Sequence, residues 1–145
     1  MPRIFVSSVI SAPSEKVWDQ VRDFNGLPNW VPMVSESHIQ DGLLPDQVGC
    51  IRDFSLQNGD RITEQLVALS DYDMSLSYVI LSSPMALDNY FATLRLTPVT
   101  ETDETFVEWS AEFDCASEDA DELIDTVSVG VFESGLKSLA RKFTS

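Results

Sequence analysis

The chain has 145 residues, of which 24 are acidic and 9 are lysine or arginine, giving a formal net charge of −15. This charge argues against a partner that is nucleic acid or an anionic membrane surface, because both bind through a basic surface. The length suits one domain with a substantial core, so we expect a single domain over residues 1–145.

Few residues of the usual catalytic or metal-binding types are present. Cys50 and Cys115 lie far apart in the sequence, do not form a disulfide framework and lack basic neighbours that would activate a thiol. His38 is the single histidine, which leaves no partner for a zinc site or a catalytic triad. We expect no metal, no cofactor, no secretory signal and no membrane insertion, and therefore a reduced protein of the cytoplasm.

The first third of the chain predicts one strand and two short helices. Residues 3–10 alternate too weakly to show a polar face but have the composition of a strand. Pro13 is suited to the first turn of a helix, and Gly26 is suited to its end. Residues 27–30 predict one more helical turn, which Pro32 stops.

The middle of the chain predicts six further strands joined by short turns, which favours an antiparallel sheet. We place them near residues 33–40, 48–56, 61–69, 74–81, 89–98 and 105–115. At Asn58-Gly59, a three-residue loop over 58–60 would put Phe54 and Ile62 on the same face of the sheet. Burial of one face normally decides register, so we prefer that loop.

The last stretch predicts a helix over residues 118–143, capped by Ser117, with acidic residues in its first turn and basic residues in its last. Its apolar residues form two stripes, which change over near Gly130 and Gly135. The glycines indicate either a tolerated bend or room for a group beside the helix. Two stripes need two surfaces, which the concave sheet and the short helices can supply. The class is α+β: a curved seven-stranded antiparallel sheet wrapped around a C-terminal helix.

Two charged residues interrupt the inward-facing rows of the predicted sheet. Arg52 lies between Cys50 and Phe54, and Glu64 lies in the next strand, where a loop over 58–60 makes the two charges diagonal neighbours. A buried charge needs a partner. The pair is either a structural ion pair or a polar anchor for a ligand in an apolar cavity, and the two can coexist.

Several short motifs, in this order and spacing, resemble one superfamily. They are Ala12 to Trp18, Asp23-Phe24, Trp30, Val48 to Asp53, Ile62 to Leu66, Ser77-Tyr78, Asn89-Tyr90 and the terminal helix. The chain resembles the START-like, birch-pollen-allergen superfamily (SRPBCC), in its bacterial polyketide cyclase/dehydrase-like branch. The resemblance covers the whole chain and implies a helix-grip fold with a hydrophobic cavity.

The middle of the chain is also similar to plant abscisic-acid receptors, at Glu64, Tyr78, Asn89 and Tyr90. The receptors' hormone-binding lysine is replaced by Pro32, their gate loop is longer, and their latch is replaced by residues 85–87. We therefore do not transfer hormone recognition or a phosphatase partner. From the resemblance and the inward rows we expect a ligand site formed by Arg52, Phe54, Glu64, Tyr78, Ile80, Leu87, Tyr90, Trp109, Val127 and Val131.

The leading hypothesis is a protein that binds a small hydrophobic or amphipathic molecule, of lipid, polyketide or isoprenoid type, in that cavity. The alternative is a polyketide cyclase/dehydratase-like enzyme. It would use Glu64 as acid or base, with a tyrosine or Arg52 stabilising an enolate. A third possibility is a partner-binding module whose interior is filled by side chains. Loops 57–60 and 82–88 would form the cavity mouth, and the sequence does not indicate the oligomeric state.

Overall fold

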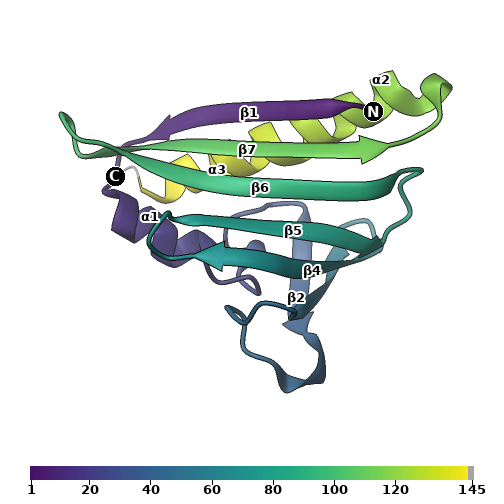
Figure 1. Ribbon diagram of the computed structural model, residues 1–145, viewed down its shortest axis with the longest axis horizontal. Coiled ribbons are helices and arrows are strands. Elements are labelled where there is room, and N and C mark those ends of the chain that lie inside the picture. The colour runs from purple at the N-terminus through teal and green to yellow at the C-terminus, as the bar shows by residue number, and fades with distance from the viewer. Residues whose placement is uncertain (144–145) are drawn as a thin grey trace.

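The computed structural model describes residues 1–143, and Figure 1 shows a layered arrangement of one sheet and one long helix. The strands are β1 (Arg3–Ile10), β2 (Val34–Ile39), β3 (Ile51–Leu56), β4 (Arg61–Ser70), β5 (Ser75–Ser82), β6 (Asp88–Val99) and β7 (Glu104–Asp114). The short helices after β1 are α1 (Ser14–Val21) and η1 (Leu27–Asn29), and η2 (Gln40–Gly42) is a single turn after β2. The C-terminal helix is built from η3 (Ser117–Asp119), α2 (Ala120–Asp125), η4 (Thr126–Glu133) and α3 (Ser134–Lys142).

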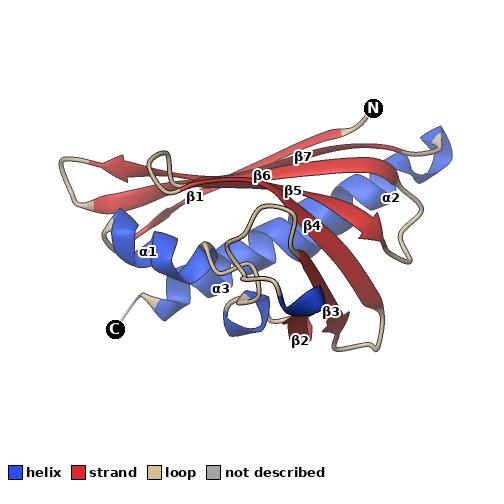
Figure 2. Cartoon of the chain, turned by 60° about the horizontal axis from the view of Figure 1, so that its bottom comes forward, coloured by secondary structure: helices blue, strands red, loops and turns tan. Residues whose placement is uncertain are grey.

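The seven strands form one antiparallel sheet in the order β1-β7-β6-β5-β4-β3-β2, which confirms the predicted architecture. The ladder between β4 and β5 shifts register after Thr63 and again after Leu66. Such irregularities bend a strand and increase its twist. Figure 2 shows the resulting curvature, with the sheet arching over the long helix.

The β3–β4 hairpin has the predicted face but not the predicted pairing. Leu56 donates its N–H to the carbonyl of Asp60 at 2.8 Å, so the three loop residues are 57–59 rather than 58–60. Gly59 has φ +94°, the left-handed conformation that glycine adopts without strain. The ladder is therefore displaced by two positions, and Arg52 lies directly opposite Glu64 instead of diagonal to it.

The C-terminal helix is continuous, but its central segment η4 is a π-helix. The helix buries Leu123, Val127, Phe132, Leu136 and Leu139. At about 100° per residue, Val127 and Phe132 would lie about 140° apart on an α-helix. The wider π turn bonds residues five apart and brings both onto one side. The two predicted stripes thus form one buried face, which corrects the expectation of two separate faces.

The helix ends also differ in detail from the prediction. The chain enters the long helix through the single turn η3, and the side chain of Ser117 makes no capping hydrogen bond. Helix α1 ends at Val21, before the predicted end at Gly26, and Pro13 precedes its first turn. None of the helices within residues 1–143 has the combined length and apolar character needed to cross a bilayer.

The short helices close one end of the sheet. Helix α1 buries Val17, Trp18 and Val21, and Figure 1 shows it beside the C-terminal end of α3. Trp18 Nε1 donates to Asp71 Oδ1 at 2.7 Å, and Arg22 Nε donates to the same oxygen at 2.8 Å. These bonds join α1 to the β4–β5 turn, at the end of the sheet away from α2.

Candidate functional site

A cavity of about 240 Å³ lies between the concave face of the sheet and the first half of the C-terminal helix. The helix contributes Thr126, Val127 and Val131, all from the π-helical segment η4. The sheet contributes inward-facing residues of β3 to β7, which are Arg52, Phe54, Leu56, Ile62, Glu64, Tyr78, Ile80, Tyr90 and Trp109. The cavity is therefore bounded mainly by apolar and aromatic side chains around one ion pair.

The ion pair is formed by Arg52 and Glu64, whose side chains are only 6% and 8% exposed. Arg52 Nε donates to Glu64 Oε1 at 2.8 Å, and Arg52 Nη2 donates to the same oxygen at 2.5 Å. The third guanidinium nitrogen, Nη1, donates to the carbonyl of Phe24 at 3.2 Å. The predicted inward orientation and pairing of the two charges are thus confirmed, in a buried setting where an unpaired charge is costly.

Glu64 Oε2 accepts no hydrogen bond from any residue between 1 and 143. The oxygen is not sealed in protein either, because over the same residues Trp30 Nε1 is the buried side-chain polar atom that has no partner. Since Glu64 lines the cavity, this second carboxylate oxygen borders the enclosed space. The carboxylate has four lone-pair sites, so Oε2 can accept a hydrogen bond from a molecule placed there.

Burial changes the acid–base properties of the site. Desolvation raises the pKa of Glu64, although the charge and hydrogen bonds of Arg52 act in the opposite direction. The net rise in the pKa therefore comes from burial, which outweighs the opposing effects of Arg52. Burial also raises the pKa of Tyr78 and of Tyr90, so both phenols keep their protons at neutral pH. The tyrosines can therefore donate hydrogen bonds but do not act as bases there.

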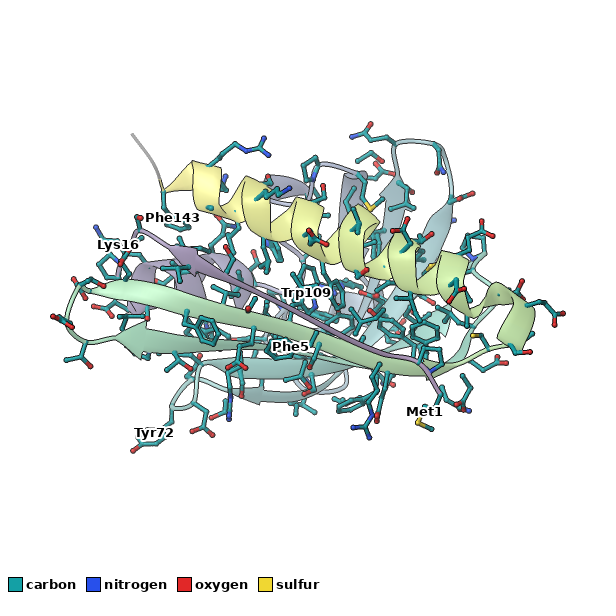
Figure 3. All side chains as sticks on the ribbon, turned by 90° about the horizontal axis from the view of Figure 1, so that it is seen from above. Met1, Phe5, Lys16, Tyr72, Trp109 and Phe143 are labelled. Atoms are coloured by element: carbon teal, nitrogen blue, oxygen red, sulfur yellow. The ribbon has the colours of Figure 1, made fainter. Side chains whose placement is uncertain are left out.

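The aromatic walls are fixed by contacts among themselves. Trp109 Nε1 donates to the Tyr78 hydroxyl at 3.0 Å, and the Trp109 ring stacks on Phe132 with centroids 4.1 Å apart. Figure 3 places Trp109 among the side chains between the long helix and the strands. The ring of Tyr90 lies 6.3 Å from that of Tyr78 and stacks on Phe113. These contacts limit the freedom of the walls, so the cavity is preformed.

Nine of the ten residues expected at the ligand site line this cavity, and Leu87 does not. Leu87 instead lines an open hollow on the outside, between the β5–β6 turn and the start of the C-terminal helix. Loops 57–60 and 82–88 contribute Asn58, Asp60, Pro84 and Met85. The prediction that both loops border the opening agrees with this lining. That the nine residues hold a ligand stays a prediction.

Sequence reasoning missed one wall of the cavity. Leu27, Val31, Met33 and Val34 line it from η1 and the start of β2. The sequence does indicate this wall, because these apolar residues lie on either side of a helical turn that begins near Pro28 and ends before Pro32. The short helices were expected only to supply a packing surface for the C-terminal helix, so their second role as a cavity wall was missed.

The two glycines of the long helix have different environments. A Cβ on Gly135 would lie 3.1 Å from Trp109 Cζ3 and 3.4 Å from Trp30 Cζ3, whereas a Cβ on Gly130 would meet nothing within 4 Å. Gly135 thus makes room for two indole rings and not for the cavity. The hydroxyl of Ser128 donates a hydrogen bond to the carbonyl of Ile124, within the helix itself.

The remaining reactive residues lie apart from the cavity. His38 is exposed in β2, with Nε2 3.8 Å from Asp53 Oδ2. Cys50 is fully enclosed, and burial raises the pKa of its thiol. The sequence composition favours two small buried cysteines, and this is wrong for Cys115, which is half-buried. Within residues 1–143, no group of three or more His, Cys, Asp and Glu side chains is arranged to hold a metal ion.

The sequence was compared with protein families and with curated proteins. A family model described as polyketide cyclase / dehydrase and lipid transport matches residues 1–144. No curated protein matches the chain.

Solved structures with the same fold cover nearly the whole chain. The protein XoxI from Bacillus cereus is 30% identical with a TM-score of 0.89, and the match covers 99% of this chain and 96% of that one. A Thermobifida fusca protein is 31% identical with a TM-score of 0.90, covering 99% and 93% of the two chains. Norcoclaurine synthase from Thalictrum flavum, in complex with dopamine and hydroxybenzaldehyde, has a TM-score of 0.76, and the match covers 99% and 88% of the two chains. Its identity of 14% shows a shared fold alone.

Proposed function

The chain belongs to the polyketide cyclase / dehydrase and lipid transport family, and we propose that it binds a small, mostly apolar molecule in the cavity beneath its sheet. The observation that carries this proposal is the free Oε2 of Glu64, which borders an otherwise apolar space. Ligand sites commonly combine an apolar lining with a few polar groups that fix orientation.

A purely structural role explains this arrangement less well. A buried carboxylate that serves only packing gains most when both of its oxygens are bonded, because a partly satisfied polar group costs stability. Here Arg52 bonds one oxygen twice and leaves the other open to the cavity. The ion pair therefore both stabilises the interior and offers one acceptor to a guest.

Catalysis is the second candidate, and the raised pKa of Glu64 favours it. A carboxyl group whose pKa moves towards neutrality exchanges protons more effectively near neutral pH. Glu64 would take a proton from a bound molecule, and the Tyr90 hydroxyl would donate a hydrogen bond to the oxygen that gains charge. An enzyme of this kind must first bind its substrate in the same cavity, so binding is the first property to test.

The test uses two substitutions on the same helix. Val127 is 2% exposed and lines the cavity, whereas Val129 is 50% exposed on the other side of η4. Native mass spectrometry of the purified protein, together with NMR spectra recorded against a panel of small aromatic, terpenoid and fatty compounds, would detect occupancy. We expect bound mass or shifted resonances for the wild type and for Val129→Trp, and neither for Val127→Trp.

Two outcomes would overturn the proposal. One is a wild type that carries no bound mass and shows no shift with any compound. The other is a Val127→Trp variant that binds as well as Val129→Trp, because the ligand would then lie elsewhere. Thermal unfolding of both variants serves as the folding control, since overpacking costs about 1–3 kcal/mol and leaves most domains folded.

A further inference from the structure

The volume of the cavity limits what it can hold. An engineered protein cavity of about 150 Å³ accepts benzene, whereas sites for drug-sized molecules span about 300–1,000 Å³. The volume of this cavity, about 240 Å³, lies between these values. The space therefore suits a molecule with one ring or a short branched chain, and it is too small for a sterol or a multi-ring polyketide.

The guanidinium of Arg52 is largely engaged, because three of its five N–H groups donate hydrogen bonds within the protein. Its Nε and Nη2 donate to Glu64, and its Nη1 donates to the carbonyl of Phe24. Aromatic rings cover the group, with the Phe24 centroid 3.8 Å and the Tyr78 centroid 4.7 Å from Cζ. A ligand carboxylate would therefore have to compete with Glu64 for this cation.

The other charges around the cavity are negative. Glu64 lies inside, and Asp60 lies at the mouth, where its side chain accepts a hydrogen bond from Asn58 Nδ2 at 3.2 Å. An anionic ligand would lose its hydration and face these carboxylates, and both effects oppose binding. A cationic ligand would enter a space in which Arg52 already neutralises Glu64, so its attraction to that carboxylate would add little binding free energy.

Resting on the proposed function, we infer that the cavity selects an uncharged, single-ring-sized molecule whose hydroxyl group donates a hydrogen bond to Glu64 Oε2. Alcohols and phenols meet this description. The ring would contact the aromatic walls, and the Tyr90 hydroxyl would have to turn from that of Tyr78 to donate a hydrogen bond to the ligand oxygen. The same site would reject carboxylates of equal size, including short fatty acids.

The test compares four compounds of similar size that differ in one polar group. They are 2-phenylethanol, its methyl ether, phenylacetate and 2-phenylethylamine, titrated at pH 7.5 and followed by NMR and by calorimetry. A hydrogen bond to a charged group contributes enough that its loss weakens binding roughly tenfold or more. We expect the alcohol to bind most tightly, the ether at least about tenfold more weakly, and the two ions more weakly still.

A variant isolates the role of the carboxylate. The double substitution Arg52→Met with Glu64→Leu removes the ion pair as a unit and leaves no buried charge. We expect this variant to bind the alcohol and the ether with dissociation constants that agree within about twofold, because the acceptor is gone. If the double variant does not fold, Glu64→Gln replaces it, because glutamine has an acceptor without a charge. We expect the dissociation constants of the alcohol and the ether to differ less for this variant than for the wild type.

The outcomes separate this inference from the proposed function. If the ether or phenylacetate binds the wild type as tightly as the alcohol, the selection for a neutral donor is wrong while the binding cavity stands. Tightest binding of the amine would equally overturn it, in favour of a cation site. If none of the four compounds binds and the broader panel also gives no shift, the proposed function itself fails.

Discussion

Removing one partner of the Arg52–Glu64 pair should destabilise the protein far more than removing both. Loss of one member of a buried ion pair typically costs about 3–5 kcal/mol, because the other charge remains buried without a partner. Replacing both members by apolar residues of similar volume is often neutral or stabilising by about 1–4 kcal/mol. We therefore expect a large favourable coupling free energy, at least about 3 kcal/mol, between Arg52→Met and Glu64→Leu.

The two single variants should also differ from each other. Glu64→Leu leaves a guanidinium that cannot lose its proton, so its cost should be nearly independent of pH. Arg52→Met leaves a carboxyl group that can bind a proton, so its cost should be smaller at pH 5 than at pH 8. Contacts of Arg52 with the rings of Phe24 and Tyr78 would moderate the first cost slightly.

Urea unfolding followed by tryptophan fluorescence measures these free energies. A domain of this size is stable by about 5–15 kcal/mol, so losses of 3–5 kcal/mol leave a measurable transition. Arg61→Met is the matched control, because Arg61 bonds Asp53 at 2.7 Å but is 64% exposed. Water screens such pairs, and we expect a much smaller loss there. Single-variant costs below about 1 kcal/mol at Arg52 and Glu64 would refute the description of a buried, mutually dependent pair.

Three further predictions concern the helix and the titrating carboxyl groups. Gly130→Ala should stabilise the helix by about 0.5–1 kcal/mol, whereas Gly135→Ala should cost about 1–3 kcal/mol because its Cβ meets Trp109 at 3.1 Å; equal unfolding midpoints would contradict this. Carboxyl NMR should show the pKa of Glu64 above the ordinary 4.5. Because the folded state then keeps a proton that the unfolded state has lost, wild-type stability relative to Glu64→Gln should fall as pH rises from 4.5 to the folded pKa. Hydrogen bonds from Arg22 and from Trp18 lower the pKa of Asp71, so its contribution should be present above pH 3.8 and be lost as pH falls through its lowered folded pKa; a flat difference in stability between wild type and Asp71→Asn would argue against these bonds.

The sheet was predictable because strand patterns are local. Alternation of apolar and polar residues identified the inner face, and burial of that face decided which of two loop lengths was allowed. The alternation does not distinguish registers that differ by two residues, since both bury the same face. The direct pairing of Arg52 with Glu64 therefore needed the conformation of Gly59 and the bond from Leu56 to Asp60.

The site was predictable in part for the same reason. Inward rows placed Glu64, Tyr78 and Trp109 correctly, because their strands have regular geometry. Leu87 was misplaced because it was taken from the resemblance to the receptors, and it lies in the loop before β6, where residues 85–87 replace the receptors' latch. The walls from η1 were missed because their position depends on how a non-repeating segment folds back, which no periodic pattern encodes.

The π-helical winding of residues 126–133 lets the C-terminal helix hold one residue more than an α-helix that buries the same face. Deleting one residue between Val127 and Phe132 would leave these two residues four apart, and at about 100° per residue they would lie about 40° apart on an α-helix. Phe132, Leu136 and Leu139 would then stay on the side that Leu123 and Val127 bury. Outside this segment, an insertion of one residue would need a second wide turn to keep the same face inward. Members of this family whose helix is one residue shorter should therefore lose that residue within this segment, together with its π-helical winding, and other changes of length should fall at the helix ends.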